Sequence, residues 1–206
     1  MQPFTQWEAI GAPIDERNLD TNQLCPTRFN KVPLSDPDYQ RILFNNQRFD
    51  DAGNELPDFI LNTPPYRSAG VLVADENFGC GSSRETAVYA LLAFGIRSVI
   101  APSFGDIFNG NALKNGLVPV RLTREICDSL RSQLHAQPGA TVMVDLRRLL
   151  VIAPDGAEHV FDIHPKARRC LLDGLDEIGL TLQSQPAIET FEASYKPSLR
   201  WIYPQS

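Results

Sequence analysis

The sequence predicts an α/β fold with a partly parallel central sheet and an antiparallel extension. Between residues 69 and 137, short apolar segments alternate with segments of helical periodicity, the arrangement that builds a parallel sheet. Between residues 141 and 163, three short apolar segments follow one another with a Pro-Asp-Gly turn, which is typical of an antiparallel meander. The length of 206 residues suits one domain, or one domain with extensions.

The alternating part of the chain contains three strands and three helices. The strands are predicted at 70–74, 98–101 and 117–120, and the helices at about 84–95, 104–115 and 123–137. Gly95 is a suitable C-terminal cap for the first helix, and Thr123 is a suitable N-terminal cap for the third. Pro119 favours an edge position for the third strand, because proline lacks the N–H that a neighbouring strand needs.

The remaining segments are less regular. The meander is predicted to use strands at 141–145, 149–153 and 159–163, followed by helices at 165–173 and 185–193 and a loose polar tail. Residues 1–68 are rich in Pro, Asn and Asp, so we expect irregular structure there, with a short helix at 38–44. Long loops in a compact domain are more often functional than idle.

Composition excludes several classes of function. The net charge is −6 and no run of five basic residues occurs, which argues against a nucleic-acid partner. The four cysteines form no CxxC pair, so we expect no metal or cluster on this chain and thiols kept reduced in the cytoplasm. The N-terminus does not resemble a signal peptide, and no apolar run reaches the ~18 residues of a membrane helix. We therefore expect a cytoplasmic protein with no membrane partner.

The most informative stretch runs from Glu76 to Glu85 and reads ENFGCGSSRE. It follows a predicted strand and precedes a predicted helix. Two glycines would turn the backbone and permit its close approach to a ligand. A helix N-terminus has unpaired N–H groups and a partial positive charge, so it attracts anions. The sequence therefore predicts a carboxylate or phosphate site formed by Ser82, Ser83 and Arg84.

This stretch has other interpretations. A capping serine beside a solvated arginine is the simplest alternative. A P-loop would need Gly-Lys-Ser/Thr, and a hydrolase elbow would need Gly-x-Ser-x-Gly; neither occurs here. Cys80 could be a thiolate activated by the helix terminus, but His135, His159 and His164 are all distant in sequence. A Cys–His enzyme is therefore disfavoured.

A second candidate region lies near the N-terminus, at Asp20-Thr21-Asn22-Gln23-Leu24. An Asx turn or helix cap is the alternative there. Arg28 follows it as the nearest basic residue, with an ordinary surface arginine as its alternative.

These motifs resemble a known family. The strings LDTNQLCPTRF, VLVA, ENFGCGSSRE, VIAPSFGDIFNGNALKNGLVPV and DGLDEIGLTL are similar to the small subunit of bacterial 3-isopropylmalate dehydratase, from about residue 8 to 195. In that family the small chain is the counterpart of the mobile swivel domain of aconitase. The resemblance implies a single swivel domain of β/β/α type over residues 1–206, with its core at about 8–195.

The resemblance also implies a function. Such a chain would work in a heterodimer or heterotetramer with an aconitase-like large subunit that carries a [4Fe–4S] cluster, while it binds no metal itself. The reaction would remove water from a 2-hydroxy dicarboxylate and add it back at the neighbouring carbon. Ser82 would be the base, Ser83 and Arg84 would hold a substrate carboxylate, and Thr21, Asn22 and Arg28 would be further substrate contacts.

The sequence departs from the family pattern at several positions. Thr86 replaces a histidine, Val88 a proline and Asn22 an aspartate, while Thr27-Arg28 stand where a lysine is common. These changes leave open a divergent paralogue acting on a citramalate, methylcitrate or dimethylmalate type of diacid. They also leave open a non-catalytic, partner-binding swivel domain and a stand-alone anion-binding domain. The segment 31–39 differs as well and is the expected place of side-chain discrimination.

Overall fold

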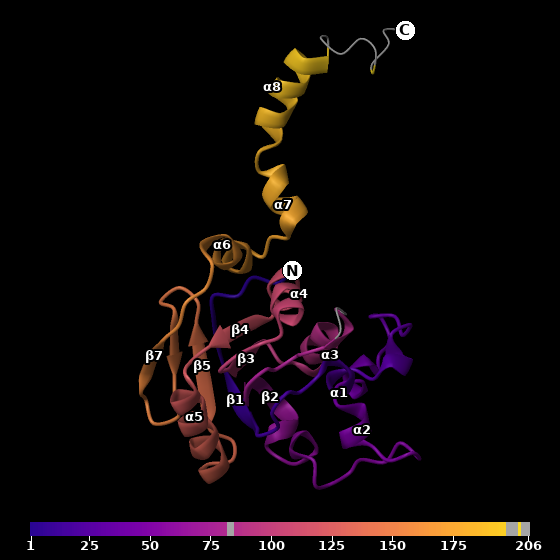
Figure 1. Ribbon diagram of the computed structural model, residues 1–206, viewed down its shortest axis with the longest axis vertical. Coiled ribbons are helices and arrows are strands. Elements are labelled where there is room, and N and C mark those ends of the chain that lie inside the picture. The colour runs from indigo at the N-terminus through magenta and orange to yellow at the C-terminus, as the bar shows by residue number, and fades with distance from the viewer. Residues whose placement is uncertain (82–84, 197–201, 203–206) are drawn as a thin grey trace.

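The computed structural model describes residues 1–81, 85–196 and 202. Seven strands of the described residues form one sheet in the order β4-β3-β2-β1-β5-β6-β7 (Figure 1). The strands are β1 Gln6–Ile14, β2 Ala69–Ala74, β3 Ser98–Ala101, β4 Val118–Arg121, β5 Thr141–Asp145, β6 Leu150–Ile152 and β7 Glu158–Val160.

The sheet has a parallel half and an antiparallel half. Strands β1 to β4 are parallel neighbours, whereas β5 to β7 form the antiparallel meander. The predicted fold class is therefore confirmed. Pro119 lies on β4, at one edge of the sheet, as its missing N–H requires.

The prediction of irregular structure throughout residues 1–68 was wrong, because β1 is the central strand. Its first half, from Gln6 to Ile10, pairs with β5, and its second half pairs with β2 after a shift in register at Ile10 and Gly11. Pro13 lies beyond the last pair with β5, so β1 has there a strand neighbour on one side only. Proline is tolerated in such a position. Gly11 and Pro13 are residue types that usually indicate a loop, so the sequence did not predict a strand here.

Helices cover both faces of the sheet. They are α1 Thr21–Leu24, α2 Asn45–Arg48, α3 Thr86–Phe94, α4 Asp106–Asn115, α5 Arg124–Ala136, α6 Pro165–Asp173, α7 Glu177–Leu182 and α8 Gln185–Tyr195. One apolar cluster packs α1, α3 and α4 on one face, and a second packs α5 and α6 on the other. Strand β2 is buried at all six positions because its side chains alternate between the two clusters.

Several element boundaries differ from the predictions. The predicted helix at 38–44 is a 3₁₀ turn, Tyr39–Arg41, and α2 begins after it. Thr123 is the N-cap residue of α5, but its side chain makes no capping hydrogen bond. Helix α7 was not predicted. Most of the tail that the sequence marks as loose lies outside the described residues.

Helices α7 and α8 form an arm that extends away from the body of the molecule (Figure 1). The chain turns into it at Gly174, which caps α6 with a φ of +69°. No residue of either helix is buried. Large apolar side chains of the arm are exposed: Ile178, Leu182, Ile188, Phe191 and Tyr195.

Candidate functional site

The loop that follows β2 carries the predicted anion site. It leaves the sheet at the carboxyl ends of the parallel strands, the edge where open α/β sheets bind ligands. Gly79 and Gly81 have φ values of +71° and +91°, so they turn the chain as predicted. Helix α3 begins at Thr86. Three candidate residues lie outside the described residues: Ser82, Ser83 and Arg84.

The two glycines have different surroundings. A Cβ on Gly79 would lie 2.3 Å from Cγ of Phe108, and a Cβ on Gly105 would lie 2.6 Å from the carbonyl oxygen of Gly79. Gly79 is therefore required by the packing of the loop against α4. At Gly81 the nearest described atom is Cβ of Asp20, at an ordinary 3.7 Å. Among the described residues, Gly81 thus has less crowded surroundings than Gly79.

The second candidate region lies directly against this loop. The N–H groups of Gly79 and Cys80 both donate to the carbonyl of Leu19, at 2.7 and 3.2 Å, and the N–H of Thr21 donates to the carbonyl of Cys80 at 3.0 Å. Regions about 60 residues apart in sequence are thereby joined through their backbones. The structure thus places Thr21 beside the residues that precede Ser82.

Asp20 is the N-cap of α1. Its Oδ1 accepts hydrogen bonds from the N–H groups of Asn22 and Gln23, both at 2.8 Å, and the Gln23 side chain completes a capping box. The helix-cap alternative therefore describes Asp20 correctly. Its carboxylate holds α1 in place.

Thr21 and Asn22 differ in burial and in partners. Thr21 is 4% exposed. Its Oγ1 is buried without a hydrogen-bond partner in the part of the chain that the structure describes. An unpaired buried hydroxyl costs roughly 1–3 kcal/mol, so such a group calls for an explanation. Asn22 is exposed, and its Oδ1 accepts a hydrogen bond from Oγ1 of Thr27 at 2.8 Å.

Arg28 points to another part of the molecule. Its Nη2 donates to Oδ1 of Asn45 at 2.6 Å, and its guanidinium lies 4.6 Å from the centroid of the Phe29 ring. It lines a polar hollow of about 540 Å³ together with Arg41 and Asp50. Among the described residues, no hydrogen bond or ion pair joins Arg28 to the loop at 75–81. Its role as a substrate contact stays a prediction.

The first turn of α3 is tied to the segment after α1. Oγ1 of Thr86 donates to Oδ1 of Asn30 at 3.3 Å. The hydroxyl of Tyr89 donates to the Glu85 carboxylate at 2.7 Å, and this bond, with burial, raises the pKa of Tyr89 to about 12. Thr86 thus has a structural partner at the position where the family pattern has histidine.

The described surroundings of Cys80 favour the neutral thiol. Its Sγ donates to the carbonyl of Asn18 at 3.2 Å. Burial raises the pKa of the Cys80 thiol, and the Asp20 carboxylate raises it further. The three histidines lie on other elements, with His135 on α5, 2.8 Å from the Asp15 carboxylate. The structure therefore agrees with the sequence in disfavouring a Cys–His enzyme.

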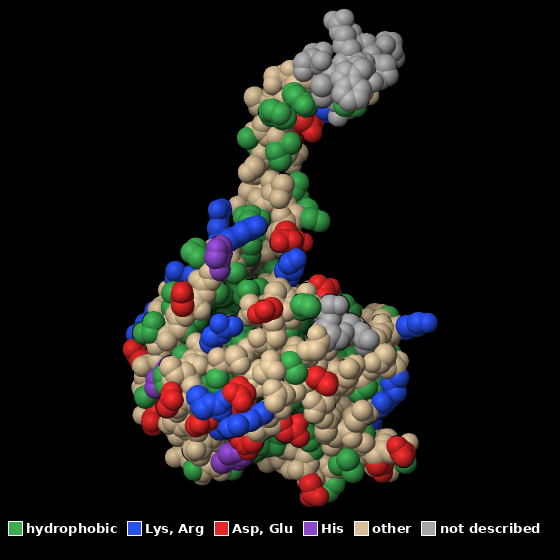
Figure 2. Space-filling model, viewed as in Figure 1, with side chains coloured by type: hydrophobic (Ala, Val, Ile, Leu, Met, Phe, Trp, Pro, Cys, Tyr) green, Lys and Arg blue, Asp and Glu red, His purple; other side chains and the backbone are tan. Residues whose placement is uncertain are grey.

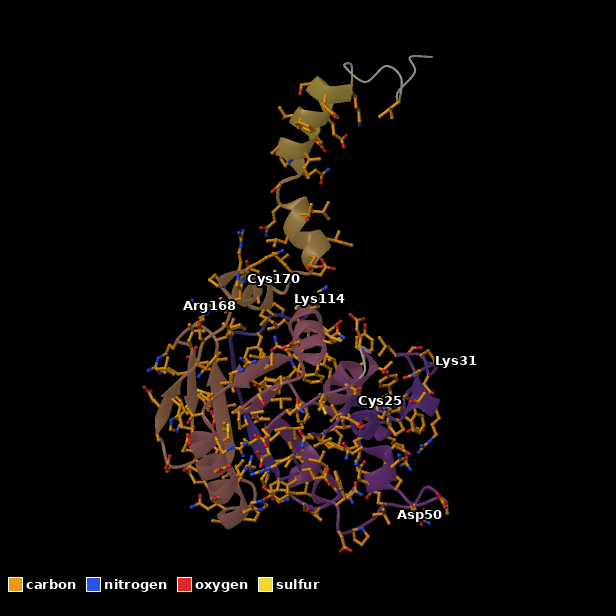
Figure 3. The ribbon with its side chains drawn as sticks, viewed as in Figure 1. Cys25, Lys31, Asp50, Lys114, Arg168 and Cys170 are labelled. Atoms are coloured by element: carbon orange, nitrogen blue, oxygen red, sulfur yellow. The ribbon has the colours of Figure 1, made fainter. Side chains whose placement is uncertain are left out.

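The other cysteines are buried in separate elements. Cys25 follows α1 in the body, and Cys170 lies on α6 at the base of the arm (Figure 3). Burial raises the pKa of Cys127, on α5, to about 12. Among the described residues, no group of three or more His, Cys, Asp or Glu side chains could hold a metal ion.

A cluster of charged side chains that the sequence analysis missed lies behind the loop. Asp75, the residue after β2, is 5% exposed and contacts Arg17, Arg124 and Arg131. Glu76 contacts Arg17 and Arg124. The arginines are far from Asp75 in sequence, so no local motif signals the cluster. The single cue was a pair of acidic residues at the end of a buried strand.

The surface carries both signs of charge. Acidic and basic side chains are interspersed over the body in the view of Figure 2. No helix within the described ranges is both long and apolar enough to cross a membrane.

Three family models match consecutive parts of the chain. Residues 1–125 match the aconitase C-terminal domain. Residues 128–165 match the model described as LeuD_N, and residues 177–205 match the C-terminal domain of the 3-isopropylmalate dehydratase small subunit. The last of these matches covers α7 and α8.

Similar proteins span almost the same length. A 3-isopropylmalate dehydratase small subunit of Gluconacetobacter diazotrophicus is 49% identical over 201 residues, covering 98% of this chain and 97% of the relative. One of Paramagnetospirillum magneticum is 46% identical over 202 residues, covering 98% of this chain and all of the relative. The resemblance inferred from the motifs is confirmed.

A solved structure shares the fold. The crystal structure described as 3-isopropylmalate dehydratase (leuD) of Methanocaldococcus jannaschii superposes with a TM-score of 0.64 at 24% identity, covering 91% of this chain and 99% of that one. The fold is thus that of a swivel domain of the aconitase type. Matched by family models over most of its length and by near-full-length relatives, the chain belongs to the family of 3-isopropylmalate dehydratase small subunits.

Proposed function

We propose that this chain is the small subunit of a cytoplasmic two-chain hydro-lyase that interconverts 2-isopropylmalate and 3-isopropylmalate in leucine biosynthesis. The observation that carries the proposal is the near-full-length identity of 49% to a relative of that name. The layout of the loop after β2 supports it, because a strand, two glycine turns and a helix of nine residues flank the candidate base.

The reaction needs a base and fixed anion-binding groups. The proton to be removed lies beside a carboxylate, so its removal adds negative charge to oxygens that are already anionic. Ser82 is proposed as the base. A serine is a weak base at its ordinary pKa, and both a helix N-terminus and a neighbouring arginine favour its alkoxide. Ser83 and Arg84 are proposed to hold a substrate carboxylate, which fixes the reacting carbon near the base.

Thr21 is proposed to contact substrate or the residues that bind it. Its buried Oγ1 has no hydrogen-bond partner among the described residues, which supports this role, since a bound oxygen would remove the cost of an unsatisfied hydroxyl. The hydrogen bond from its N–H to Cys80 fixes its position relative to the loop. Asn22 is proposed as a neutral hydrogen-bonding contact, because an amide cannot act as a base.

The large subunit is proposed to be aconitase-like and to carry a [4Fe–4S] cluster. The four cysteines of this chain form no CxxC pair, a spacing in which cluster ligands commonly occur, and this supports a cluster held by the other chain. When bound, the cluster supplies a Lewis acid for the hydroxyl that departs and returns.

The arm is proposed as part of the contact with the large subunit. Ile178 and Phe191 are 71% and 61% exposed, although apolar side chains of this size are usually covered. Proteins of this family are named small subunits, so a large chain is the occupant that accounts for the exposed surface.

The experiment is to express the chain together with an aconitase-like large subunit and to assay hydration of 2-isopropylmaleate anaerobically. The Ser82→Ala complex should lose about 10²- to 10⁴-fold in kcat, the usual contribution of a general base. Ser132→Ala is the matched control, because Ser132 is an exposed α5 residue whose hydroxyl bonds the Asp128 carbonyl.

A panel of unsaturated diacids decides between the alternatives. If the complex turns over citraconate or dimethylmaleate in preference to 2-isopropylmaleate, its substrate is a different diacid from the one proposed. Unchanged turnover in Ser82→Ala would support a non-catalytic swivel domain, and failure to co-purify with any large chain would support a stand-alone anion-binding domain.

A further inference from the structure

A buried carboxylate with three arginine partners lies at the start of the candidate loop. Oδ1 of Asp75 accepts from Nη1 of Arg124 at 3.0 Å, while Oδ2 accepts from Nη2 of Arg131 at 3.2 Å and from Nε of Arg17 at 3.4 Å. The side chains of Asp75 and Arg131 are 6% and 9% exposed. We call these four residues, together with Glu76, the Asp75 clasp.

The clasp joins three elements of the fold. Arg17 follows β1, Asp75 and Glu76 follow β2, and Arg124 and Arg131 lie on α5, which follows β4. Nη1 of Arg131 also donates to the carbonyl of Ala74, the last residue of β2, at 2.9 Å. The backbone is therefore held at the point where β2 becomes the loop.

Stability alone is a poor reason for such a cluster. Burying a carboxylate and a guanidinium costs desolvation energy, and their mutual attraction often does no more than offset that cost. Well-packed apolar residues at the same positions can therefore stabilise a fold equally well. A planar guanidinium that contacts a carboxylate and a carbonyl together fixes direction as well as distance. What the clasp supplies beyond apolar packing is one defined backbone path out of β2.

That path leads to the glycine loop. Asn77, two residues after Asp75, has a φ of +60° and donates from its backbone N–H to Oγ of Ser103 at 2.8 Å. Next, Phe78 is fully buried with its ring 5.3 Å from that of Phe108. Six residues of the chain separate Asp75 from Ser82, so the clasp fixes the point at which the backbone enters the segment that leads to the proposed base.

We propose that Asp75 and Arg131 are positioning residues for the reaction: they fix the loop that carries the proposed base while touching no substrate themselves. This inference rests on the proposed function for its kinetic part. Its structural part, that the clasp holds residues 75–81, is independent of what the enzyme turns over.

Two variants of the assembled two-chain enzyme test it. Asp75→Asn keeps the shape of the side chain and removes its charge. Arg131→Lys keeps the positive charge and removes the planar guanidinium that contacts two acceptors at once. Both should lower kcat by about 10- to 100-fold, the effect expected of a misplacement of about 1 Å, with KM changed less than kcat. Hydrogen exchange of peptides covering residues 75–81 should become faster. Asp75→Glu, which restores the charge, should recover part of kcat.

Arg148→Gln is the matched control, because it removes an exposed arginine paired with Glu158 on the β6–β7 hairpin, and it should leave kcat and exchange unchanged. A loss of thermal stability in Asp75→Asn with unchanged kcat would overturn the positioning role. So would a loss of kcat without faster exchange in the loop. If the wild-type complex does not turn over isopropylmaleate, the proposed function fails, and exchange still decides whether the clasp holds the loop.

Discussion

Single residues of the loop after β2 meet different physical demands, and Gly79 and Gly81 show this most clearly. Both adopt positive φ, yet Gly79 also lies against the Phe108 ring whereas Gly81 does not. A methyl group added to either residue is strained by the backbone, but at Gly79 it also collides with a buried aromatic side chain.

Gly79→Ala should therefore destabilise the protein by about 2–4 kcal/mol, the sum of strain and overpacking, and Gly81→Ala by about 1–2 kcal/mol. Denaturant unfolding of the isolated chain measures both. Equal losses in the two variants would show that Phe108 does not limit the site.

Cys80 is predicted to be dispensable for chemistry. Its pKa is raised by burial and by Asp20, so at a mildly alkaline pH of about 8 less of it is thiolate than of an unperturbed thiol. Alkylation by iodoacetamide should be slower than that of a free thiol and should keep rising above a pH of about 9. Cys80→Ser should retain turnover and serves as the labelling control. Rapid alkylation at neutral pH with complete loss of activity would contradict the assignment.

At the scale of single residues, the sequence predicted contacts between residues close together in the chain, but not contacts between residues far apart in it. The cap formed by Asp20 depends on two residues within the same turn, so the sequence offered it as an alternative. The partners of Asp75 come from positions 17, 124 and 131, and no periodicity brings those positions together.

At the scale of elements, helix α5 supports the centre of the sheet. A Cβ on Gly11 of β1 would lie 2.8 Å from Cδ2 of Leu134, which is fully buried. The Leu134 carbonyl also accepts a hydrogen bond from the Tyr66 hydroxyl at 2.9 Å. Leu130 and Leu134 both lie on the buried face of α5.

Leu134→Ala should lower the free energy of unfolding by about 2–5 kcal/mol, because it removes buried methyl groups where the backbone of β1 approaches α5. Ile107→Ala is the control, since Ile107 is half exposed on α4, and its effect should stay within about 0.5 kcal/mol. Thermal and denaturant unfolding give both values. A loss at Leu134 no larger than the loss at Ile107 would contradict this account.

The elements that the sequence predicted well are those with a strong local period, such as β2, α5 and the meander. Strand β1 was not predicted because it changes its pairing partner in mid-strand. Its first half therefore alternates in burial, whereas its second half is buried throughout. A single period does not describe such a strand. The glycine and the proline within it then suggested a loop.

At the scale of the whole molecule, the body and the arm differ in how their apolar side chains are covered. The described buried residues run from Phe4 to Leu171, and the arm follows them in the sequence. Met1 holds the base of the arm through a hydrogen bond from its amino group to the Gly174 carbonyl at 3.2 Å. The arm is thus attached to the body at its base and exposed beyond it.

A chain ending at Leu175 should keep the unfolding temperature of the body and lose its association with the large chain. Analytical ultracentrifugation and co-purification measure the association. Glu189→Gln in the full chain is the control, because it changes one exposed charge of α8 and retains the apolar side chains. Undiminished association of the shortened chain would show that the arm is not the contact.

The divided pairing of β1 also constrains the order in which the molecule can be completed during synthesis. This strand is translated before both of its neighbours, of which one ends at residue 74 and the other at residue 145. Until the second neighbour has been made, half of β1 has no strand beside it. The first half of β1 therefore gains its strand neighbour only when β5 has been made, so the centre of the sheet is completed late.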